Sequence, residues 1–188
     1  QWLTRPAVFV HGVAIAYWAG ALVPLGMALR RGSTEAVPAL RRFSATIPAV
    51  VALLVAAGLI LAIVQVGTPA ALVETAYGRV FLVKLGLLAI LFALAAWNRW
   101  RLTAPVEGGD RRMAGRLVRS IAAETVVVLL ILGVAAAWRF TPPPRALAAA
   151  AAVPASFHVH TAKAMAEVTI TPGRAGPVDV SAIIMSGD

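Results

Sequence analysis

Four long apolar stretches, separated by short polar ones, dominate the pattern of this chain. They cover about residues 6–29, 44–66, 79–98 and 120–138. A helix rises ~1.5 Å per residue, so about 20 apolar residues are enough to cross a hydrocarbon core of ~30 Å. The pattern therefore predicts an all-α membrane protein in which four transmembrane helices form a bundle.

The pattern changes near the C-terminal end of the sequence. Residues 167–171 and 178–184 alternate apolar and polar side chains around a turn at residues 172–177, which is typical of strands. We interpret residues 156–188 as the start of an extracytoplasmic β-sandwich domain and residues 1–140 as the membrane domain. Residues 141–155, rich in proline and alanine, are expected to be a linker, with a short helix lying on the membrane as an open alternative.

Positive charge is concentrated in two of the polar connections. Residues 30–43 hold four arginines and residues 99–119 hold six, whereas residues 67–78 hold no lysine or arginine. Short basic connections are retained on the cytoplasmic side of a membrane. We therefore expect both ends of this sequence to be extracytoplasmic.

Composition excludes a mainly water-soluble protein. The chain is 60% hydrophobic and 13% charged, with a mean hydropathy of +0.84. In a soluble protein, a net charge of +9 would indicate nucleic-acid binding. Here the arginines that orient the membrane helices account for this charge, so we expect no nucleic-acid partner. Cysteine is absent, which excludes disulfides and thiolate metal ligands. Because the sequence starts at Gln1 and stops within a strand pattern, we expect it to be a piece of a longer protein.

Away from their first residues, the predicted spans contain the ionisable residues His11, Lys84 and Glu124. An ionisable group there costs roughly 2.5–3.5 kcal/mol on insertion scales and is a functional candidate by default. His11 is the strongest candidate, although it could simply bond a neighbouring helix. Lys84 could extend its ammonium group to the headgroups, and Glu124 could pair with an arginine at the inner surface.

Depth in the membrane suggests one polar cluster near the outer surface. If the four spans alternate in direction, His11 and Lys84 lie at a similar depth near the outer surface. Gln65 ends the second span on the same side, and Glu74 and Tyr77 lie in the connection above it. Glu124 falls near the opposite surface, so it cannot pair directly with Lys84. This cluster is an expectation from depth alone.

A second candidate site lies in the strand region. On an extended strand, His158 and His160 project to the same face, a spacing suited to copper(II) or zinc. A solvated strand face is the alternative interpretation. Met165 and Met185 offer soft sulfur donors suited to copper(I), although packing in a core is the more frequent role of methionine. The candidate metal ligands are thus His11, His158 and His160.

Sequence motifs of common enzymes are absent. The chain has no phosphate-binding glycine loop, no Ser/His/Asp set, no paired catalytic carboxylates and no metalloprotease spacing. We therefore expect a protein that is not an enzyme and has no catalytic residues.

Several stretches resemble a known family. These are LRRFSATIPAVVALLVAAGLILA, TAYGRVFLVKLGLLAILFALAAWNRWRL, the arginine-rich connection, Glu124 and the closing TPPP. Together they resemble the copper resistance D (CopD) membrane domain, over about residues 40–144. HGVAIAYWAG, which contains His11 and Trp18, looks like the helix that precedes that domain. AEVTITPGRAGPVDVSAIIMSGD is similar to the periplasmic β-sandwich of longer members.

This resemblance implies a protein of the bacterial cytoplasmic membrane that handles copper ions. It implies copper uptake or transfer across the membrane, with a periplasmic copper chaperone of the CopC type as the donor. The family supplies no set of membrane ligands to carry over, so the three candidate histidines rest on the spacing arguments above.

Two alternatives of other classes stay open. A histidine followed by Trp18 and Gly20, with Lys84 in a later span, also looks like the haem-dependent protoporphyrinogen oxidase membrane family. A single histidine in the spans argues against a haem bound by two histidines within them. The other alternative is an assembly factor without a metal, whose β-domain docks a partner.

Overall fold

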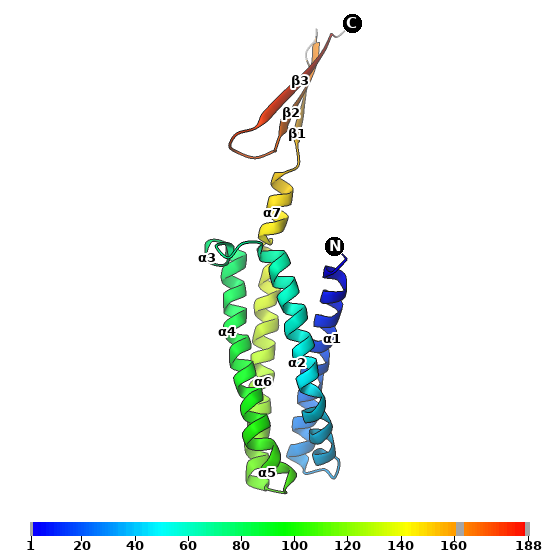
Figure 1. The fold of residues 1–188 in the computed structure, drawn as a ribbon, viewed down its shortest axis with the longest axis vertical. Helices are drawn as coiled ribbons and strands as arrows, with labels where there is room; N and C mark the ends of the chain where they lie inside the picture. Colours follow the sequence, from blue (N-terminus) through cyan, green and yellow to red (C-terminus); the bar gives the residue numbers. More distant parts are fainter. Residues whose placement is uncertain (1, 161–163, 187–188) are drawn as a thin grey trace. The chain divides into compact units, whose positions relative to one another are not determined.

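The structure, a computed structural model, describes residues 2–160 and 164–186 (Figure 1). It divides into two compact units, Gln1–Thr141 and Pro142–Asp188. The first unit holds the long helices, and the second holds a short helix and a sheet.

Four long helices make up the first unit. They are α1 (Thr4–Arg31), α2 (Ala36–Val66), α4 (Ala76–Trp97) and α6 (Arg111–Ala136). Each belongs to one of the four helical segments of the described chain that are long and apolar enough to cross a membrane. Short elements connect or extend them: α3 (Ala71–Glu74), the π-helix η1 (Asn98–Leu102), α5 (Thr103–Glu107) and the 3₁₀-helix η2 (Ala137–Phe140). The predicted set of four membrane helices is confirmed.

Helix α6 begins at Arg111 rather than at Ser120, because Asp110 caps it. The Asp110 carboxylate accepts hydrogen bonds from the backbone N–H groups of Arg112 and Met113, at 2.9 and 3.0 Å. Such a side chain satisfies N–H groups that the first turn leaves without partners. The arginines expected in a polar loop therefore lie mostly on a helix, and only residues 108–110 separate α5 from α6.

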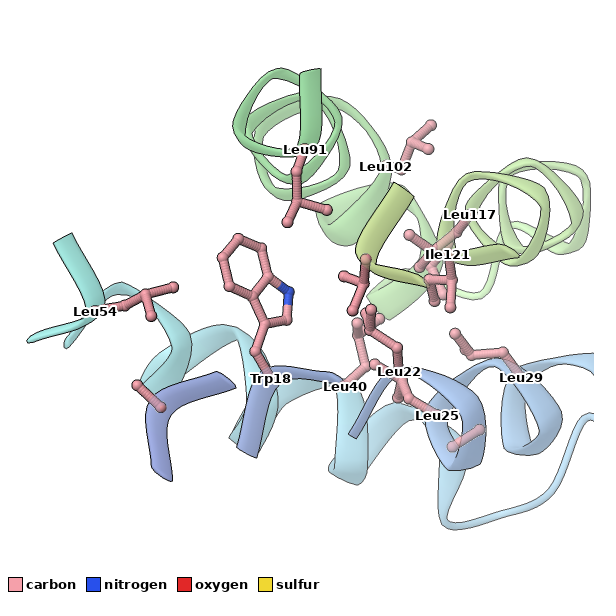
Figure 2. Close-up of a cluster of buried hydrophobic side chains, with 14 residues drawn as sticks. Trp18, Leu22, Leu25, Leu29, Leu40, Leu54, Leu91, Leu102, Leu117 and Ile121 are labelled. Carbon is pink, nitrogen blue, oxygen red and sulfur yellow. The ribbon is translucent and has the colours of Figure 1, made fainter. Parts of the chain in front are cut away.

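Helix α1 packs against both α2 and α6, and α6 also packs against α4. A stripe of buried side chains on α1 faces this interior at the helical spacing of three and four residues: Ala14, Trp18, Leu22, Leu25 and Leu29. Figure 2 shows Trp18 at the middle of this cluster, with Leu54 and Leu91 projecting toward it from α2 and α4. The Trp18 ring also stacks on Phe92, with centroids 5.9 Å apart.

Large apolar side chains also cover the outside of the bundle. Exposed examples on the long helices include Leu53, Leu59, Ile63, Ile90 and Leu129. A soluble protein rarely exposes so much contiguous apolar surface, whereas lipid tails solvate it without cost. The outer surface is therefore suited to a bilayer.

The second unit begins with α7 (Pro144–Ala151), so the expected linker contains a short helix. Three antiparallel strands follow in the order β1-β2-β3: β1 (Ala155–His160), β2 (Ala164–Thr171) and β3 (Asp179–Ser186). The predicted strands are confirmed as a small sheet. The backbone of Gly173, in the turn after β2, lies close to Val153. A Cβ atom at Gly173 would be 2.5 Å from the carbonyl oxygen of Val153.

Candidate functional site

His11 is held against helix α2. Its Nδ1 lies 3.2 Å from the carbonyl oxygen of Leu54. One turn further along α2 stands Gly58, where a Cβ would lie 3.2 Å from the His11 Cε1 atom. The lack of a side chain at Gly58 therefore makes room for the imidazole, which is partly buried.

This contact determines which ring nitrogen of His11 can act as a ligand. A carbonyl oxygen only accepts hydrogen bonds, so Nδ1 must carry the proton. In a neutral imidazole the other nitrogen, Nε2, then keeps its lone pair. No hydrogen bond to Nε2 is found within the described residues. Histidines that bind metals commonly have their second nitrogen bonded in this way, which fixes the ring orientation.

Lys84, on helix α4, lies close enough to His11 for an electrostatic interaction. Its ammonium nitrogen sits 4.7 Å from the centre of the Trp138 ring, a cation–π contact. Trp138 in turn stacks on Tyr77 and Phe81, with centroids 5.1 and 6.1 Å apart. Lys84 is therefore partly buried against aromatic rings.

The expected outer cluster is thus formed in part. His11 and Lys84 interact, and Lys84 and Tyr77 share Trp138 as a neighbour. Across the described residues, no hydrogen bond or ion pair connects Gln65 or Glu74 to these side chains. Sequence reasoning missed Trp138 as the residue that organises this end of the bundle, although a tryptophan at the end of a span is a usual signal of an interface.

A second polar pair lies toward the other end of the bundle, where α5 is found. Glu124 is only 3% exposed and accepts a hydrogen bond of 2.6 Å from the Asn98 side-chain nitrogen. The Asn98 side-chain oxygen is buried and has no hydrogen-bond partner among the described residues. Asn98 opens the π-helix η1, a distortion that is frequent at functional sites. Sequence reasoning overlooked Asn98, because a stretch of tryptophans and arginines such as residues 97–101 is typical of an anchor at the membrane surface.

A cavity of about 50 Å³ adjoins this pair. Its lining combines Glu124, Asn98 and Arg99 with apolar side chains that include Trp18 and Leu22. Most of this lining is apolar, but the volume is large enough for a water molecule. A water molecule bound there would donate a hydrogen bond to the Asn98 side-chain oxygen.

The expectation that Glu124 pairs with an arginine is wrong. Asn98 takes that place, while Arg99 donates instead to the backbone and side-chain oxygens of Ser44, the latter at 3.0 Å. Among the described residues, Arg41 is the arginine that pairs with a carboxylate: its Nε atom lies 3.5 Å from Oε2 of Glu107. Arg116 and Arg119, the arginines nearest to Glu124 in sequence, are exposed.

The two histidines of β1 share one face of the sheet, as their spacing predicts. The rings of His158 and His160 are stacked with centroids 6.4 Å apart. Glu167, the partner of His158 on β2, brings its carboxylate to 3.8 Å from His158 Nε2. Both imidazoles are exposed. The pair is therefore accessible to an ion or to a donor protein.

Neither histidine site is a complete metal centre of nitrogen and carboxylate ligands. Across residues 2–160 and 164–186, no three His, Cys, Asp or Glu side chains are grouped so that they could hold a metal ion. Any bound ion needs water, sulfur or another molecule to complete its coordination. The assignment of His11, His158 and His160 as ligands remains a prediction.

Comparison with known proteins gives one family. The family model described as copper resistance protein D matches residues 37–138. The curated Copper resistance protein D of Pseudomonas syringae pv. tomato is 31% identical over 140 residues, which cover 68% of this chain and 45% of that protein. The chain thus spans less than half the length of this relative. No solved structure matches the chain.

Proposed function

Because the chain belongs to the copper resistance protein D family, we propose that it receives copper outside the bacterial cytoplasmic membrane and transfers it inward. The ion is the cargo of this process. Two features support the proposal: four helices that can span a bilayer, and histidines both within the bundle and on an exposed strand.

The observation that carries the proposal is the hydrogen bond between His11 and Leu54. A histidine inside a span is costly, and here it is fixed so that its unprotonated nitrogen can bind a metal. A histidine that only joined two helices would make the same hydrogen bond. The effect of a His11 substitution on copper binding therefore decides between a role as a ligand and a structural role.

His158 and His160 would act first, as the receiving site for copper. They lie side by side on a strand and are exposed, so a donor protein can approach them. A small copper chaperone of the CopC type fits this role. Exchange of ligands between two exposed sites moves an ion without releasing it into solution.

The distribution of arginines supports the orientation. Arg30 and Arg31 end helix α1, and Arg111 and Arg112 begin helix α6, so these basic groups lie at the end of the bundle that holds α5 (Figure 1). Basic residues at span ends favour the cytoplasmic side. His11 then lies in the outer half of the bundle, nearer to an external donor.

The experiment measures copper accumulation in cells that express the full-length protein. We expect His11→Ala and the double variant His158→Ala/His160→Ala each to lower accumulation at limiting copper. Matched controls are Val13→Ala, an exposed residue of α1, and Ser156→Ala on the strand that carries the histidines. If both histidine variants accumulate copper as the wild type does, the assignment of these ligands fails.

Elemental analysis of the purified protein tests the class of function. We expect copper in the wild-type protein and less of it in the histidine variants. Iron with a strong haem absorption band would instead favour a haem protein. A protein without metal that captures a specific partner would favour an assembly factor.

A further inference from the structure

The two faces of the small sheet differ sharply in chemistry. Side chains alternate along a strand, and residues directly opposite each other on neighbouring strands share a face. Following the register gives one face that is apolar along most of its length: Ala155, Phe157, Val159, Ala166, Val168, Ile170, Val180, Ala182 and Ile184. The other face carries the two histidines, Glu167, Asp179, Ser and Thr residues, Met165, Met185 and one aliphatic side chain, Ile183.

On that second face, one row crosses all three strands with donor atoms suited to a soft metal. His160 on β1 lies opposite Met165 on β2, and Met165 lies opposite Met185 on β3. The neighbouring row is formed by His158, Glu167 and Ile183. The stacked histidine rings and the contact between His158 and Glu167 confirm that these side chains project from the same face.

The two methionines are not explained by a hydrophobic core. The apolar face is the one that a second layer of a β-domain would cover, and neither methionine belongs to it. Met165 is 38% exposed and Met185 is 47% exposed. Two thioethers aligned with a histidine on the polar face therefore need another role.

We propose that His160, Met165 and Met185 form a copper(I) site. Thioether sulfur is a soft ligand that selects copper(I), and imidazole binds copper as well. The inference rests on the proposed function, and it adds that the cargo reaches this unit in the reduced state. No redox step is involved, because the ion enters and leaves the site as copper(I).

The strand geometry allows the three donors to meet at one ion. Neighbouring strands are about 4.8 Å apart, so the outer strands flank β2 at roughly that distance on either side. An ion above Met165 is then within reach of His160 from one side and of the long, flexible Met185 side chain from the other. His158, with its ring 6.4 Å from that of His160, stands beside the row and can pass an ion to it.

The test measures copper(I) affinity of the full chain in detergent under a reducing agent, by competition with the chromophoric chelator bicinchoninate. The variant is Met165→Leu/Met185→Leu, which removes both sulfurs and nearly conserves volume. The matched control is Met27→Leu/Met113→Leu, which removes two sulfurs from the helices α1 and α6. X-ray absorption of the copper(I) form reports sulfur neighbours directly.

We expect the wild type and the control to bind copper(I) equally well, and the Met165→Leu/Met185→Leu variant to bind it at least about tenfold more weakly, since even indirect changes at a metal site cost that much. The sulfur signal should vanish in the same variant. Unchanged affinity, or a spectrum without sulfur neighbours, overturns the proposal. Cellular copper accumulation tests the proposed function separately: it can fail while this site binds copper(I), or persist when the site does not.

Discussion

The imidazole of His11 and the backbone of Gly58 are matched in shape: a Cβ at Gly58 would come within 3.2 Å of His11 Cε1. This is closer than ordinary van der Waals contact, so the pair leaves no room for a methyl group unless the ring moves. The ring position depends on this fit and on the hydrogen bond to Leu54.

Gly58→Ala should therefore displace the His11 ring and weaken copper binding. Alanine is also the better helix former by about 1 kcal/mol, so the helix itself gains stability. We expect lower copper content on elemental analysis without a lower unfolding temperature. Gly86→Ala is the control, because a Cβ there meets no atom within 4 Å. Equal copper loss in both variants would contradict a role for the close contact.

Lys84→Met should strengthen copper retention at His11. The ammonium group repels a bound cation, and in a medium of low dielectric this repulsion is larger than in water. We expect several-fold tighter binding in a copper competition titration, with no gain for Lys84→Arg, which keeps the charge. Arg79→Gln removes an exposed charge from the same helix and should leave affinity unchanged. Weaker binding in Lys84→Met would show that Lys84 supports the site.

Asn98→Ala should destabilise the bundle, because it removes the side-chain N–H group that donates a hydrogen bond to the buried carboxylate of Glu124. We expect a loss of about 1–3 kcal/mol in the free energy of unfolding, measured by denaturant titration in detergent. In a protein that already carries Glu124→Ala, the Asn98→Ala substitution should lower the free energy of unfolding by a smaller amount. The coupling energy should exceed about 0.6 kcal/mol, the mean for hydrogen bonds between membrane helices. Equal costs in both backgrounds would refute the coupling.

The orientation can be tested with single cysteines, since the chain has none of its own. Ser33→Cys lies in the connection between α1 and α2, and Thr68→Cys lies in that between α2 and α3; both positions are exposed. A maleimide that cannot cross membranes should label Thr68→Cys in intact spheroplasts and Ser33→Cys only after lysis. The reverse pattern would invert the topology and place His11 near the cytoplasm.

Two helix boundaries show where pattern reasoning reached its limit. The start of α6 moved because the Asp110 cap and the intrinsic helicity of arginine outweigh the polar character of residues 111–119. Most of the chain between α4 and α6 is helical as well, because η1 and α5 follow α4 directly and include Arg99 and Arg101. Polarity indicates where a helix leaves the membrane and does not indicate where it ends.

The sequence by itself determined the four membrane helices, the strands and the shared face of His158 and His160, because these follow from periods of 3.6 and 2 residues that are local to each segment. Only the tertiary structure decided the partners. The bond from Asn98 to Glu124, the stacking of Trp138 on Tyr77 and the row of His160, Met165 and Met185 each join residues whose contact depends on helix packing or strand register. Packing and register arise from interactions between segments, so the periodic pattern within a single segment does not predict them.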